Sequence, residues 1–92
     1  MDRRNKMALE KVILVDKIEV LEMGQIQVRT AIRIKEGGKI LSQSFMRSIV
    51  VPGSDLSGQD AKVTAIANAI WTSEVVSAYE TMIAEQEAKR SI

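Results

Sequence analysis

The sequence predicts an α+β fold, in which a three-stranded antiparallel meander (order 1-2-3) is packed by one long or kinked C-terminal helix. Two observations predict it. Every even position from Ile26 to Ile34 is β-branched and most odd positions between them are polar, a period of two that is typical of a strand with one buried face. Residues 60–88 contain neither proline nor glycine and are rich in alanine, which favours a helix.

Two glycine turns set the expected register of the meander. Gly37 and Gly38 suit a two-residue type I′ turn, which places Thr30 opposite Phe45. Gly24 suits the left-handed position of a three-residue loop with a G1 bulge, which places Asp16 opposite Thr30. The inner face predicted by this register carries Val12, Leu14, Ile18, Val20, Ile26, Val28, Ile32, Ile34, Leu41, Phe45, Ile49 and Val51.

The elements form one predicted domain over residues 11–88, between a flexible arm (1–10) and a frayed tail (89–92). Strands are expected at about 11–21, 25–36 and 39–51, and a helix at about 58–88 with Ser57 as its N-cap. The apolar stripe of this helix changes phase near residues 71–73, and Thr72 is a good N-cap type. We therefore expect a kink or a break there, with the first segment on the sheet and the second extending past its edge.

The composition argues against an enzyme. The 92 residues include no cysteine and no histidine, so disulfides, thiolate metal sites and imidazole bases are all missing. We predict no catalytic residue, cofactor, metal or small-molecule substrate. The net charge of +1 gives no overall attraction to nucleic acid or to an anionic membrane, and no apolar run reaches the length of a membrane span. These features predict a cytoplasmic protein with no membrane partner.

Two charged residues, Asp16 and Arg47, fall on the predicted inner face, one diagonal step apart across the central strand. We interpret them as a structural polar pair. Inward charges on edge strands also discourage edge-to-edge aggregation.

The predicted outer face offers two kinds of interaction. Lys17, Arg29 and Arg33 form a basic surface that would contact nucleic acid, but RNA-binding sheets stack bases on aromatic residues and none is expected on this face. The same face is expected to carry Ile13, Val15 and Met46, an apolar group that suggests a protein interface.

The second helical segment adds Trp71, Tyr79 and Met82 to the predicted interface, since aromatic and methionine side chains are enriched at interfaces. The alternative for Trp71 is that it closes one end of the core. The partner expected is a second copy, with a dimer favoured, or another protein; nucleic acid is the alternative.

Four runs of sequence resemble small uncharacterised proteins of marine tailed bacteriophages, cyanophages included. These runs are Val15–Val20, Gln27–Thr30, Ser44–Arg47 with Val51–Gly53, and Ala69–Val75, and the resemblance covers residues 9–79. It implies a phage-encoded virion accessory or assembly factor, in the host cytoplasm or the virion. It supplies no catalytic or ligand-binding residue.

Overall fold

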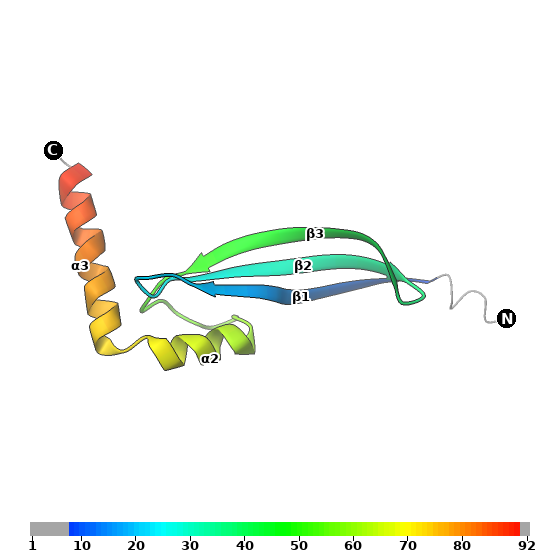
Figure 1. Cartoon of the computed structure of the whole chain (residues 1–92), viewed down its shortest axis with the longest axis horizontal. Coiled ribbons are helices and arrows are strands. Elements are labelled where there is room, and N and C mark those ends of the chain that lie inside the picture. The colour runs from blue at the N-terminus through cyan, green and yellow to red at the C-terminus, as the bar shows by residue number, and fades with distance from the viewer. Residues whose placement is uncertain (1–7, 91–92) are drawn as a thin grey trace.

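The structure is a computed structural model that describes residues 8–90. Its elements are β1 (Leu9–Val20), β2 (Ile26–Glu36), β3 (Lys39–Val50), α2 (Ala61–Ile70) and α3 (Ser73–Arg90). The strands form one antiparallel sheet in the order β1-β2-β3 and the two helices follow it, which confirms the predicted α+β fold (Figure 1). Leu9 and Glu10, expected in the arm, belong to β1, and Lys89 and Arg90, expected in the tail, belong to α3. The rest of the predicted arm and tail, residues 1–7 and 91–92, lies outside the described residues.

Both glycine turns form as predicted. Gly37 and Gly38 have φ angles of 59° and 84°, and Glu36 pairs with Lys39 across them. Gly24 has a φ of 93°, and the loop closes with a hydrogen bond of 2.8 Å from the Leu21 N–H to the Gln25 carbonyl. A Cβ disfavours these left-handed conformations, so the sequence determines where the chain reverses.

Two β-bulges change the register beyond the turns. On β1, Lys17 faces Arg29 but Val15 faces Thr30, so Asp16 is the extra residue. On β3, Ile40 faces Lys35 but Ser42 faces Ile34, so Leu41 is the extra residue. The predicted pairings of Asp16 and Phe45 with Thr30 are therefore wrong, because one inserted residue inverts the side of the sheet on which each later side chain lies.

The inversion redistributes the predicted inner face. Along β1 and β3, it moves Val12, Leu14, Phe45 and Ile49 to the face that bears the odd-numbered residues of β2. In exchange, Ile13, Val15 and Met46 lie on the face with Thr30 and Ile32.

The core lies between α2 and one part of the sheet. Ile26, Val28 and Val50 of the sheet pack with Val63 and Ala67 of α2, and all five are buried. This confirms that the first helical segment packs on the sheet.

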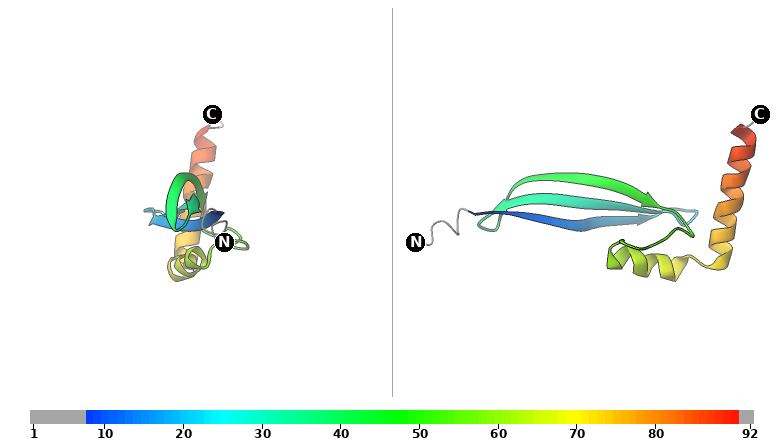
Figure 2. Two further views of the ribbon diagram at one scale, coloured as in Figure 1. Left: turned by 90° about the vertical axis from the view of Figure 1, so that its right-hand side faces the viewer. Right: turned by 180° about the vertical axis from the view of Figure 1, so that it is seen from behind.

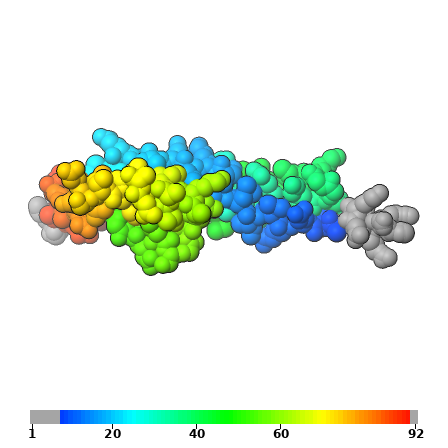
Figure 3. Space-filling model, turned by 90° about the horizontal axis from the view of Figure 1, so that it is seen from below, coloured from blue at the N-terminus to red at the C-terminus, as the bar shows by residue number. Residues whose placement is uncertain are grey.

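α2 is too short to cover the sheet. Its 10 residues rise about 15 Å at about 1.5 Å each, whereas the 12 residues of β1 extend about 40 Å at about 3.3 Å each. Figure 3, viewed from the α2 side, shows α2 and the preceding loop over one part of the sheet while the far part of β1 and the β2–β3 hairpin stay uncovered.

The predicted helix break is confirmed, and one predicted cap is wrong. α2 is capped by Asp60, whose carboxylate accepts from the Lys62 N–H at 2.8 Å, whereas the Ser57 hydroxyl donates to the Asp55 carboxylate. After the break, the Thr72 hydroxyl oxygen accepts from the Val75 N–H at 3.2 Å, as an N-cap does.

α3 extends past the edge of the sheet, as expected. It stands beyond the end of the sheet, starts at the level of α2 and rises past the opposite side (Figures 1 and 2). Among residues 8–90, no helix combines the length and hydropathy needed to cross a membrane.

Candidate interaction surfaces

The sheet face opposite α2, which we call the outer face, carries an apolar row between basic residues. The register aligns Leu14, Ala31 and Phe45 across the three strands. Ala31 is fully buried beneath its neighbours, whereas Leu14 and Phe45 are 36% and 37% exposed. The next row toward α3 consists of Lys17, Arg29 and Arg47, and the next row in the other direction contains Arg33. No described element of the chain covers this face.

The outer face is organised around a cluster of Asp16, Arg29 and Phe45. Arg29 donates two parallel hydrogen bonds to Asp16, Nε to Oδ1 at 3.0 Å and a terminal nitrogen to Oδ2 at 2.7 Å. The Arg29 guanidinium carbon also lies 4.3 Å from the centroid of the Phe45 ring, a cation–π contact. The β1 bulge is what brings Asp16 within reach of Arg29.

This ion pair shifts the pKa of both partners. The hydrogen bond from Arg29 holds the pKa of Asp16 below its ordinary value of 3.8, and the same bond raises the pKa of Arg29. The predicted pair of Asp16 with Arg47 is wrong, because the two bulges place Arg29 between them and Arg29 takes the carboxylate.

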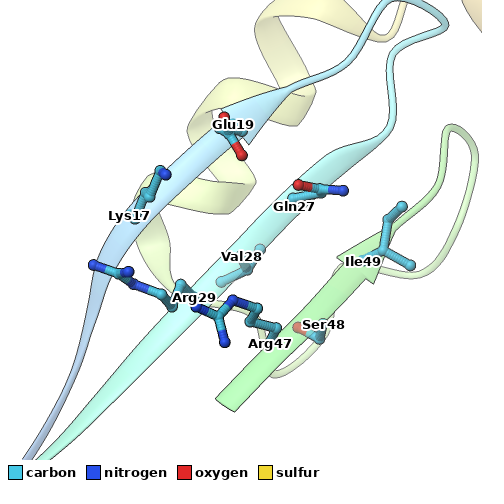
Figure 4. Close-up of a pocket in the computed structure, with 8 residues that line it drawn as sticks. All are labelled: Lys17, Glu19, Gln27, Val28, Arg29, Arg47, Ser48 and Ile49. Carbon is cyan, nitrogen blue, oxygen red and sulfur yellow. The ribbon is translucent and has the colours of Figure 1, made fainter. Parts of the chain in front are cut away.

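Arg47 lies directly opposite Arg29 on the neighbouring strand. Like charges in this position destabilise a sheet, and Asp16 neutralises only Arg29. Beside them is a surface hollow of about 410 Å³, lined by Lys17 and Glu19 of β1, Gln27 of β2, and Arg47 and Ile49 of β3 (Figure 4). The excess positive charge here suits an acidic partner.

The three residues predicted to contact nucleic acid, Lys17, Arg29 and Arg33, lie together on the outer face. Two of them already have partners, since Arg29 binds Asp16 and Arg33 donates to the Gln43 side-chain oxygen. The expectation that this face carries no aromatic is wrong, because the β3 bulge turns Phe45 onto it.

The predicted apolar interface of Ile13, Val15 and Met46 lies on the α2 side of the sheet instead of the outer face. Val15 packs against the core. Ile13 and Met46 are 59% and 61% exposed.

The joint between the sheet and α3 is tightly packed. Trp71 donates from its indole nitrogen to the Gly24 carbonyl at 2.8 Å and packs against the core, so it closes one end of that core. A Cβ on Gly24 would lie 2.8 Å from Val75, and a Cβ on Gly53 would lie 3.1 Å from Val76. The first turn of α3 is therefore held against both loops at the end of the sheet, which sets the direction in which the helix projects.

Beyond this joint, α3 has an apolar stripe bordered by acidic residues. Val75, Tyr79 and Met82 recur at spacings of four and three, with Val76 and Ile83 alongside, yet no residue of α3 is buried. At 100° per residue, the acidic residues flank this stripe on both sides, with Glu80 and Glu87 along one border and Glu74 and Glu85 along the other. Tyr79 and Met82, which the sequence analysis assigned to an interface, are half-buried on a helix that projects from the domain.

Sequence reasoning missed Leu14 and Phe45 as surface residues. One signal was present for Leu14: residues 12–15 are all apolar, so β1 has apolar side chains on both faces. No comparable signal marked Phe45, because its place on the outer face follows from the bulge at Leu41 and nothing in the sequence around Leu41 indicates a bulge.

Within residues 8–90, no three side chains of the metal-binding types come together. Comparisons with protein-family models, with curated proteins and with solved structures found no match to this chain.

Proposed function

We propose that this chain is a non-catalytic structural or interaction protein that self-associates, with a dimer as the favoured assembly. One observation carries the proposal: the apolar row of the outer face is bordered by basic residues and has no cover within residues 8–90. A three-layer arrangement would bury this face, and a sheet with apolar residues on both sides requires one.

The projecting helix supports the same proposal. Most helical stability in proteins comes from packing an apolar face against other parts of the structure. α3 has such a face and buries none of its residues within the chain. A second copy would supply cover for both unpaired surfaces at once.

The resemblance to proteins of marine tailed phages adds the proposal that this assembly belongs to a virion or to its construction. An assembly role depends on exposed apolar surface and does not require reactive side chains. The chain has neither a cysteine nor a histidine.

A second candidate function, nucleic-acid binding, gains one observation. Phe45 lies beside Arg29 and Arg47 on the outer face, and an exposed aromatic on a basic sheet is what base stacking requires. Self-association is favoured because Arg29 is already committed both to Asp16 and to the face of the Phe45 ring.

Absolute mass by light scattering after size exclusion tests the proposal, at two protein and two salt concentrations. Self-association predicts a mass that is a multiple of 10.2 kDa and rises with concentration. A mass of one chain under every condition would contradict it. A higher mass on adding single-stranded nucleic acid, which is lost steeply as the salt concentration rises, would instead support nucleic-acid binding.

A further inference from the structure

We propose that α3 of one copy docks on the outer face of a second copy, and that the second copy returns the same contact to form a two-fold symmetric dimer. This inference rests on the self-association proposed above and specifies its interface. The symmetric arrangement pairs each projecting helix with one open sheet face and leaves no unpaired surface of either kind.

The joint prevents α3 from covering the sheet of its own copy. Trp71 and Val75 hold the start of the helix against Gly24, and Val76 packs beside Gly53. From this anchor the helix runs away beyond the end of the sheet (Figure 1). Only another copy can bring a sheet face alongside Tyr79 and Met82.

The apolar parts of the two surfaces match. The stripe of α3 offers Tyr79, Met82 and Ile83, all half-buried and past the joint. The outer face offers Leu14 and Phe45, which lie on either side of the buried Ala31. Aromatic and methionine anchors at the centre of a patch are typical of protein interfaces.

The charges also match. The stripe of α3 is bordered by glutamates on both sides, and the only basic residues of the helix are Lys89 and Arg90 in its last turn. The apolar row of the outer face has Lys17, Arg29 and Arg47 on one side and Arg33 on the other. An acidic–apolar–acidic helix fits a basic–apolar–basic sheet, and the carboxylates would relieve the repulsion between Arg29 and Arg47.

Two charge-introducing variants of the full chain test the docking. Phe45→Asp places a carboxylate in the apolar row, and Tyr79→Asp places one in the apolar stripe. Each has a matched control: Ser44→Asp adds the same charge one residue away on the opposite face of β3, and Thr81→Asp adds it on the polar side of α3. Circular dichroism establishes that each variant keeps its secondary structure.

We expect the dissociation constant of the dimer to be about tenfold or more higher in both test variants than in the unmodified chain. Both controls should have the dissociation constant of the unmodified chain. An equimolar mixture of Phe45→Asp and Tyr79→Asp should associate more than either alone, because one copy retains an intact α3 and the other an intact outer face. This rescue also shows that neither variant lost association merely by misfolding.

The outcomes separate the docking from self-association itself. A monomeric unmodified chain would overturn both proposals. If the unmodified chain is a dimer and the Phe45→Asp variant dimerises equally well, self-association stands and the docking on the outer face is overturned. A mixture that associates no better than its components would show that the two patches do not meet, with the same consequence for the docking.

Discussion

Gly24 is the position where a single methyl group tests how the sheet holds α3. In Gly24→Ala, the new Cβ would lie 2.8 Å from Val75 Cγ1 and 3.2 Å from Pro52 Cγ, at a φ of +93°. The left-handed backbone alone costs a residue with a Cβ about 1–2 kcal/mol. Overpacking a filled site adds about 1–3 kcal/mol. The free energy of unfolding should therefore fall by about 2–5 kcal/mol in total.

The chain provides a matched control in Gly38→Ala. Gly38 has a φ of +84° but no atom within 4 Å of the Cβ position, so this variant carries the backbone cost alone. Urea unfolding followed by circular dichroism, at concentrations where the chain is dissociated, measures both variants. Gly24→Ala should lose about 1–3 kcal/mol more than Gly38→Ala. Equal losses would refute the packed joint, and with it the argument that α3 is held away from its own sheet.

Three further changes test other parts of the account. Trp71→Phe removes the hydrogen bond to the Gly24 carbonyl and should lower the free energy of unfolding by about 1–2 kcal/mol, measured by urea unfolding. An unchanged free energy of unfolding would show that this hydrogen bond does not stabilise the joint. Val63→Ala removes two methyl groups from a fully buried site and should cost about 2 kcal/mol in the same assay, whereas a loss near zero would mean that α2 is not packed there. Arg29 lowers the pKa of Asp16, so the ion pair stabilises the fold above the ordinary carboxyl pKa of 3.8 and this contribution is lost as the pH falls through the lower folded value. Asp16→Asn should therefore lower the urea midpoint at neutral pH and flatten its decline below about pH 4, and an unchanged acid profile would contradict the pairing.

The sequence was a good guide to elements and a poor one to side-chain faces. The strands, the turns at Gly24 and Gly37–Gly38 and the break before α3 follow from local chemistry, because glycine conformations and N-caps depend on neighbouring residues. The bulges at Asp16 and Leu41 depend on contacts across strands, so the residues next to them in the sequence do not indicate them. One inserted residue was enough to exchange the two faces of β3.

The direction of that error is informative. The register counted from the turns assigned Leu14, Phe45 and Ile49 to the inside, and the structure leaves Phe45 and Ile49 37% and 53% exposed. Phe45 and Ile49 are thus interface candidates because a monomer leaves them uncovered.

The central claim, that a second copy covers the outer face, can be tested by the labelling rate of one engineered thiol. The chain has no cysteine, so Gln43→Cys places a single thiol on the outer face beside Phe45, and Thr81→Cys places one on the polar side of α3. Maleimide labelling of each variant is followed at low and at high protein concentration. The account predicts that labelling at position 43 slows as the concentration rises while labelling at position 81 does not. Equal rates at both concentrations for position 43, in a sample whose mass shows association, would contradict it.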